Sequence, residues 1–189
     1  MAATVGTTMA FGLFGRRARP DAAAADAIYA VIVAQARRPA LYRDLGAPDT
    51  VVGRFEVILL HAVLFFRRVK ASPDAAGRAQ LVFDAMVRDL DASLREIGVG
   101  DMTVPKRMKT MVGAFYARIE AYEAALDRDD DALGAALARH VYGEPAAADR
   151  AEAERFAAYV RRADAALSTQ PLADLLAAGP AFPEVEETA

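Results

Sequence analysis

The chain has 189 residues, no cysteine and only two histidines. Without cysteine there is no disulfide framework, no iron–sulfur cluster and no thiolate-ligated zinc, which fits a reducing compartment. Two histidines also leave little for a histidine-rich metal site. We therefore expect neither a metalloenzyme nor a thiol enzyme, and we expect no cofactor.

Glycine and proline are also scarce, with 12 and 9 residues, which excludes collagen-like and low-complexity chains. Hydrophobic residues make up 54% of the chain, far too many for a disordered protein. The length suits a single domain with one core.

No hydrophobic run is long enough to cross a membrane. The longest one, residues 57–66, has ten residues, whereas a spanning helix needs about 20. This run indicates a buried core helix. The first residues carry no Lys or Arg ahead of their apolar stretch, which argues against a secretory signal. Residues 9–14, followed by three arginines, form either a flexible tail or a short interfacial anchor.

The net charge of -3 is unevenly distributed. Residues 1–40 carry +3, whereas residues 127–189 carry -7. General nucleic-acid binding is not expected, because such proteins carry a strong basic excess. Twenty arginines against three lysines suggest a GC-rich bacterial genome.

Apolar residues recur at helical spacing, and alternating strand patterns are nearly absent. We predict an all-α fold, a single-domain bundle of about six to seven helices. Residues 1–20 are expected to form a flexible basic segment, 21–180 the helical domain and 181–189 a frayed acidic tail. The expected helices cover about 22–37, 51–69, 73–97, 104–126, 131–140, 149–167 and 171–179.

Local signals set several of these boundaries. Asp49 or Thr50 can cap the helix that follows, Pro39 should end the first helix, and residues 41–50 should form a loop. Ser72 should cap the third helix, with Pro73 at its first position, and Gly98 should end it in a left-handed conformation. The 51–69 helix is apolar nearly all round and should therefore be central. The side chains expected to be buried are Phe55, Ile58, Leu94, Met111 and Phe115.

No phosphate-binding loop, nucleophile elbow or His-Glu-x-x-His motif occurs in the chain. His61 lies in the most apolar helix, where a structural histidine satisfied by a neighbour is the simplest interpretation. It also shares a seven-residue spacing with Arg54 and Arg68. Because seven residues are almost two turns, all three could face one partner-binding groove.

Lys106, Arg107 and Lys109 lie in the first turns of a predicted helix, where positive charge opposes the helix dipole. A local rule broken without evident gain suggests a functional demand. We interpret the three as a docking surface for an acidic protein or anionic lipid headgroups. The alternative is a solvated face, partly compensated by Asp101.

Four charged residues crowd the end of the third helix: Asp89, Asp91, Arg95 and Glu96. We interpret them as an ion-pair network that braces the third helix against the fourth. An active site is the alternative interpretation, but these carboxylates lack an evident partner acid or metal cluster.

Several uncommon strings occur in a fixed order along the chain. They are Leu41-Tyr-Arg-Asp-Leu-Gly-Ala-Pro-Asp-Thr, Gly53-Arg-Phe-Glu with His61, Phe83-Asp, Asp89-Leu-Asp, Leu94-Arg-Glu-Ile-Gly-Val-Gly-Asp, Val104-Pro-Lys-Arg-Met-Lys and Ala114-Phe-Tyr-Ala-Arg. Together these strings resemble the ubiquinol–cytochrome c chaperone family. The similarity covers residues 29–126 and continues more loosely to residue 176, with Ala117, Leu90 and Ile97 as small or apolar departures.

This resemblance implies a non-catalytic assembly factor that binds newly made cytochrome b for ubiquinol–cytochrome c reductase. A second assembly factor or the ribosome would be further partners, and contact with an anionic membrane surface would be weak. The protein would act in the cytoplasm or at the cytoplasmic face of the inner membrane. The alternatives are a helical enzyme acting on a lipid or isoprenoid, and a plain helical scaffold.

Overall fold

The computed structural model describes residues 18–128, 131–143 and 150–185. This part of the chain contains eight α-helices, one short 3-10 helix and no strand, which confirms the all-α prediction. The elements are α1 (Ala18–Ala36), α2 (Pro39–Arg43), α3 (Val51–Lys70), η1 (Pro73–Ala75), α4 (Ala76–Glu96), α5 (Val104–Leu126), α6 (Ala132–His140), α7 (Arg150–Thr169) and α8 (Leu172–Ala178).

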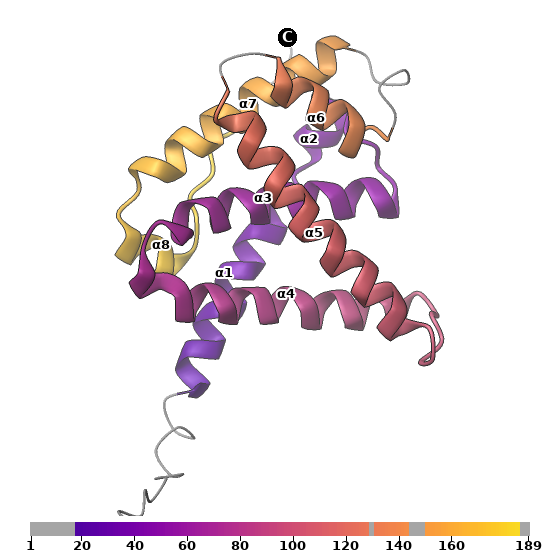
Figure 1. Ribbon diagram of the computed structural model, residues 1–189, viewed down its shortest axis with the longest axis vertical. Helices are drawn as coiled ribbons and strands as arrows, with labels where there is room; N and C mark the ends of the chain where they lie inside the picture. Colours follow the sequence, from indigo (N-terminus) through magenta and orange to yellow (C-terminus); the bar gives the residue numbers. More distant parts are fainter. Residues whose placement is uncertain (1–17, 129–130, 144–149, 186–189) are drawn as a thin grey trace, which may run out of the picture.

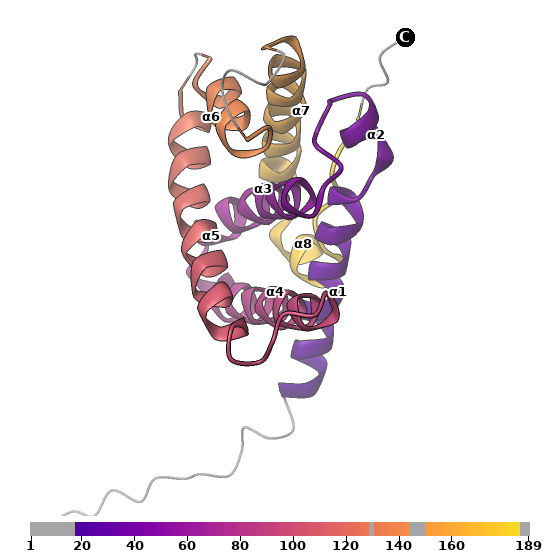
Figure 2. The same ribbon diagram turned by 90° about the vertical axis from the view of Figure 1, so that its right-hand side faces the viewer.

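Helix α3 lies at the centre of the fold. Every residue from Glu56 to Phe65 is buried, because apolar side chains surround nearly the whole helix. Figure 2 shows α3 almost end-on, with α4 and α1 on one side and α6 and α7 on the other, while α5 crosses both layers. The prediction that this helix is central is confirmed.

The helices α4 and α5 form an open V (Figure 1). They meet at the loop of residues 97–103 and diverge from there along the face of α3. Gly98 adopts a φ of 84° at the end of α4, as predicted, which suits a residue without a Cβ. The closed end of this V therefore carries both the end of α4 and the start of α5.

The start of α3 is fixed by a cap and a close backbone approach. The Thr50 hydroxyl accepts a hydrogen bond from the Gly53 backbone N–H at 3.0 Å, so Thr50 is the cap. A Cβ at Gly53 would lie 2.0 Å from the Pro48 carbonyl oxygen. Only glycine lets the preceding segment pass this close to the helix.

The structure differs from the sequence predictions at three places. Pro39 begins the short helix α2 instead of simply ending a helix, because its fixed φ suits a first helical position. Ser72 precedes η1 but its side chain makes no capping bond. Within the predicted tail, Val185 is buried and the Pro183 carbonyl accepts a hydrogen bond from Gln35, whereas residues 1–17 and 186–189 lie outside the described residues.

Three of the five predicted core side chains are buried, namely Ile58, Leu94 and Phe115. Phe55 and Met111 are only half-buried. Both line a surface groove at the closed end of the V, so their hydrophobicity serves an open surface as well as the core. This groove is the first feature of interest for function.

Candidate functional site

A groove of about 500 Å³ opens where the start of α3, the end of α4 and the start of α5 meet. Its floor is apolar, and its polar groups are two threonines and two basic residues. We call it the tip groove; its lining is Val51, Val52, Phe55, Leu94, Ile97, Thr103, Lys106, Arg107, Thr110 and Met111.

Large hydrophobic side chains are unusually exposed around the tip groove. Val51 is 71% exposed, Val52 69% and Ile97 60%, while Met102 in the adjacent loop is 96% exposed. Among the described residues, Tyr116 is the one other large hydrophobic residue exposed to this degree. Because such residues concentrate at one end of the molecule, they indicate an interaction surface and not scattered exposure.

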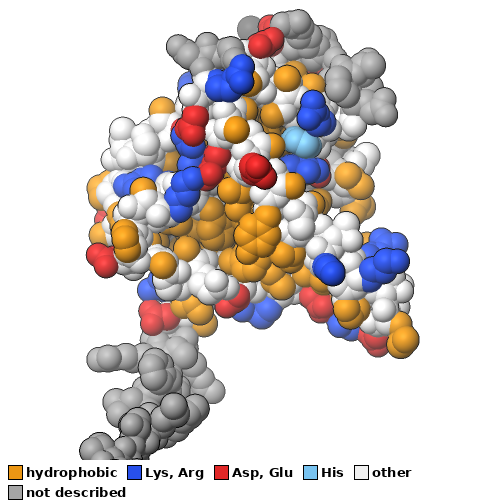
Figure 3. Space-filling view, viewed as in Figure 1, with side chains coloured by type: hydrophobic (Ala, Val, Ile, Leu, Met, Phe, Trp, Pro, Cys, Tyr) orange, Lys and Arg blue, Asp and Glu red, His pale blue; other side chains and the backbone are white. Residues whose placement is uncertain are grey.

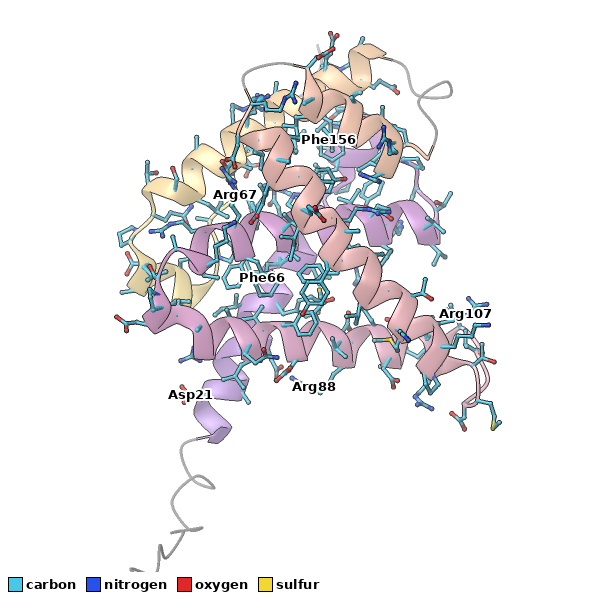
Figure 4. The ribbon with its side chains drawn as sticks, viewed as in Figure 1. Asp21, Phe66, Arg67, Arg88, Arg107 and Phe156 are labelled. Carbon is cyan, nitrogen blue, oxygen red and sulfur yellow. The ribbon has the colours of Figure 1, made fainter. Side chains whose placement is uncertain are left out.

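The predicted basic cluster lies beside these apolar side chains. Lys106, Arg107 and Lys109 are all exposed near the start of α5, and none forms an ion pair with a described residue. Figure 4 shows Arg107 directed away from the helical body, and Figure 3 shows Lys and Arg gathered at this end. The structure thus joins the cluster to an apolar groove that sequence reasoning had missed.

A second apolar surface lies in the open part of the V, over α3. Its aromatic rings contact one another, with Phe66 and Phe115 centroids 5.4 Å apart and Phe83 and Tyr116 centroids 6.0 Å apart. A groove of about 410 Å³ runs along them, and Figure 3 shows the apolar patch near the middle of this view. We call Phe66, Phe83, Phe115 and Tyr116 the aromatic face.

One partly buried ion pair holds α5 against α3. Arg118 donates two hydrogen bonds to Glu56, at 2.9 and 2.8 Å, and Glu56 is buried. The hydrogen bonds to Glu56 raise the pKa of Arg118. Sequence reasoning missed this pair, although a glutamate between Phe55 and Val57 in an apolar helix signals a buried partner.

Beside this pair, the Tyr122 hydroxyl is buried and has no hydrogen-bond partner among the described residues. Burial raises the pKa of Tyr122 far above its usual value, so the phenol remains neutral.

His61 is a structural histidine, as its simplest interpretation predicted. Its Nδ1 lies 2.8 Å from the Val57 carbonyl, and its Nε2 lies 2.9 Å from the Tyr159 hydroxyl. Because a carbonyl can only accept, Nδ1 carries the proton, and Tyr159 donates to Nε2 while accepting from Gln35 at 2.8 Å. Burial lowers the pKa of His61 to about 4, which keeps the ring neutral.

The structure does not bring Arg54, His61 and Arg68 together in one groove, and their partner-binding role stays a prediction. His61 is fully buried, and Arg54 pairs with Asp49 at 2.5 Å on the surface. Arg68 donates to the Leu167 and Gln170 carbonyls, both at 2.9 Å. It therefore caps the end of α7, where helical carbonyls lack partners. Seven-residue spacing aligned the three on α3, but α7 covers part of that face.

The network predicted at the end of α4 is only partly formed. Arg95 pairs with Asp91 at 2.7 Å and also with Asp101, so it ties α4 to the loop before α5. Asp89 instead accepts a hydrogen bond from the Tyr29 hydroxyl of α1 at 2.9 Å. Glu96 is exposed and has no ion pair with a described residue. The four residues are therefore not one cluster.

Across the described ranges, no group of three His, Asp or Glu residues could hold a metal ion. Asp89 and Asp91 do not form an acidic pair, because residues two apart on a helix point in different directions. No helix between residues 18 and 185, outside the two gaps, is long and apolar enough to cross a membrane.

Comparison with known proteins identifies the family. The sequence model of the ubiquinol-cytochrome C chaperone family matches residues 43–182. The crystal structure of the Cbp3 homolog from Brucella abortus is similar with a TM-score of 0.78 and 37% sequence identity, covering 92% of this chain and 96% of that one.

Two animal proteins are more distant relatives. The chain is 29% identical over 140 residues to ubiquinol-cytochrome-c reductase complex assembly factor 1 of Xenopus laevis, covering 73% of this chain and 69% of that protein. It is 27% identical over 136 residues to the protein of the same description from Drosophila melanogaster, covering 69% of this chain and 52% of that protein. The chain therefore belongs to the ubiquinol-cytochrome c chaperone family.

Proposed function

We propose that the protein is a non-catalytic assembly factor for ubiquinol–cytochrome c reductase, and that it holds newly made cytochrome b until assembly. The family and the names of its relatives support the assembly role. The observation that carries the client role is the aromatic face, an open apolar groove on a fold whose other aromatic side chains are mostly packed away.

The shape of this groove suits an apolar helix of the client. Three helices line it, and an amphipathic or apolar helix laid between α4 and α5 would contact Phe83 and Tyr116 directly. Phe115 is buried beneath them, whereas Tyr116 is 59% exposed. The buried Phe115 supports the exposed Tyr116, and together they give the client a contact surface. Because the groove stays open, it does not enclose the client, and the client can be released.

The groove also has a polar end. Lys70 pairs with Glu123 through Oε2 at 2.6 Å, and the other carboxylate oxygen, Oε1, is buried without a partner among the described residues. An unmatched buried acceptor costs free energy. When the Glu123 side chain rotates toward the groove, a hydrogen-bond donor on the client, such as a serine or a backbone N–H at a helix end, would satisfy this oxygen.

The proposed setting is the cytoplasmic face of the inner membrane of a bacterial cell, where cytochrome b is inserted. A second assembly factor or the ribosome would then be within reach. Arg54 and Arg68 are engaged within the fold, so the partner contacts predicted for them require these side chains to exchange partners.

Gene deletion tests this function. Deletion should lower the amount of assembled ubiquinol–cytochrome c reductase on native gels while cytochrome b transcript stays normal. Complementation with Tyr116→Asp should fail, because a charge in the groove opposes an apolar client. The matched control, Ala117→Asp on the same helix, is exposed outside the groove and should restore assembly.

Normal levels of the assembled enzyme in the deletion strain would overturn the proposal. A metal-dependent activity lost in Asp89→Asn or Asp91→Asn would support the enzyme alternative instead. Co-purification of cytochrome b with the parent chain but not with Tyr116→Asp would place the client on the aromatic face.

A further inference from the structure

We propose that the closed end of the V is a membrane-docking tip that inserts Val51, Val52, Ile97 and Met102 into the headgroup region of an anionic bilayer. This inference deepens the location in the proposed function but does not depend on the client. It concerns a different surface from the aromatic face.

The first argument is the arrangement of the apolar side chains. Val51 and Val52 come from the start of α3, and Ile97 and Met102 flank the turn between α4 and α5. Met102 is 96% exposed, does not line the groove, and lies in the 97–103 loop at the closed end of the V (Figure 1). A partner helix seated in the tip groove would leave Met102 in water, whereas a bilayer surface would cover it together with the others.

The second argument is charge complementarity. Residues 91–109 contain four basic and three acidic side chains, a net charge of +1, although the chain as a whole carries -3. Arg95 is neutralised by Asp91 and Asp101, whereas Lys106, Arg107 and Lys109 form no ion pair with a described residue. Unpaired cations next to exposed apolar side chains match the headgroup and acyl layers of an anionic membrane surface.

The third argument is the uncapped start of α5, whose backbone N–H groups add to the positive potential of the basic residues. The Thr103 side chain makes no capping bond at the start of α5, and no acidic residue lies in the first turn. Folding alone would favour an acidic residue here. Phosphate groups of lipids would supply the negative charge that the first turn of α5 lacks.

The tip can be tested with a fluorescent reporter, because the chain contains no tryptophan. In the full-length Met102→Trp variant, emission should shift to the blue and resist aqueous quenchers when vesicles of equal parts phosphatidylglycerol and phosphatidylcholine are added. The control is Tyr116→Trp, an exposed hydrophobic position outside the tip, on the aromatic face. Its emission should not change with the same vesicles.

Vesicle sedimentation then separates the contribution of the basic residues from that of the exposed apolar residues. The triple variant Lys106→Glu/Arg107→Glu/Lys109→Glu should bind these vesicles at least about 100-fold more weakly at low salt. The double variant Ile97→Ser/Met102→Ser should bind the same vesicles about tenfold more weakly than the parent. The control Arg37→Glu/Arg139→Glu/Arg155→Glu changes the net charge equally at exposed arginines elsewhere and should bind much more tightly than the tip variant.

Failure of the parent chain to bind the vesicles would overturn the inference. So would binding with unchanged Met102→Trp emission, which would assign the contact to another segment. If the tip variants bind vesicles like the parent but lose co-purified cytochrome b, the tip is a protein contact and not a membrane one. None of these results bears on whether gene deletion lowers the assembled enzyme, so the two proposals can fail separately.

Discussion

The two ends of helix α5 use positive charge in opposite ways. Toward its C-terminal end, Arg118 makes two hydrogen bonds with the buried Glu56 and ties α5 to the central helix. Near its N-terminal end, Lys106 and Arg107 are exposed, unpaired with described residues and bordered by apolar side chains. One end is integrated into the fold, and the other is available to a partner.

This difference follows from what lies opposite each segment. The C-terminal part of α5 packs between α3 and α6, where a charge must have a partner because burial removes its hydration. The N-terminal part lies at the outer corner of the V, where water solvates the cations. Stability changes should therefore be large at the integrated end and small at the tip, while binding changes should show the reverse.

The largest loss of stability is expected for Phe115→Ala. Phe115 is buried and contacts Phe66, Phe83 and Tyr116, so truncation removes the base of the aromatic face. We expect the free energy of unfolding to fall by about 3–5 kcal/mol in urea denaturation. The control Tyr116→Ala, at an exposed ring next to it, should cost far less. Equal losses for the two variants would contradict the buried position of Phe115.

Arg118→Met should have the next largest effect, because it leaves Glu56 buried without its partner. We expect the free energy of unfolding to fall by about 2–3 kcal/mol, less than for a fully buried pair because Arg118 is partly exposed. The double variant Glu56→Gln/Arg118→Met should recover part of this loss. A double variant that is less stable than both single ones would show that the pair does not act as a unit.

The helices and the central position of α3 could be predicted from the sequence, because apolar spacing and caps act locally. The 104–126 helix matches α5 at both ends, and Thr50 is the cap that was expected as one of two. The pairing of Glu56 with Arg118 could not be predicted, since it joins residues 62 positions apart. Glu56 and Arg118 each lie in a string that carries the family resemblance. The sequence of one helix, however, does not specify which other helix packs against it.

The candidate site was predicted in part. The basic cluster was identified because it breaks a local helix rule, and that rule needs no tertiary information. The apolar part of the tip was missed, because Phe55 and Met111 have the spacing of core residues and only their packing shows that they line a groove. A Val-Val pair directly after a cap and a methionine in a polar turn were the available signals.

His61 provides a pH-dependent test inside the integrated region. Its pKa of about 4 in the folded protein lies below the usual value of 6.5, so the unfolded chain binds the proton more readily. The stability of a fold that buries His61 in its neutral form is therefore fully present above about pH 6.5. It is lost as the pH falls toward 4, because protonation of His61 then favours the unfolded chain. We expect the parent to lose about 2–3 kcal/mol more than His61→Gln over this range. Parallel stability–pH curves from urea denaturation would contradict the buried neutral histidine.

The smallest effect on stability is expected at the tip, for Lys106→Glu/Arg107→Glu/Lys109→Glu. Acidic residues near the start of a helix interact favourably with its dipole, so the variant should unfold at a Tm about 1–3 °C higher than the parent. Adding salt should shrink this difference, because exposed charges are screened. A thermal scan by circular dichroism at low and high salt measures both effects. A large drop in Tm would mean that the three cations stabilise the fold and are not reserved for a partner.

A small rise in Tm together with weaker vesicle binding would show that the chain gives up stability at this end of α5 for binding.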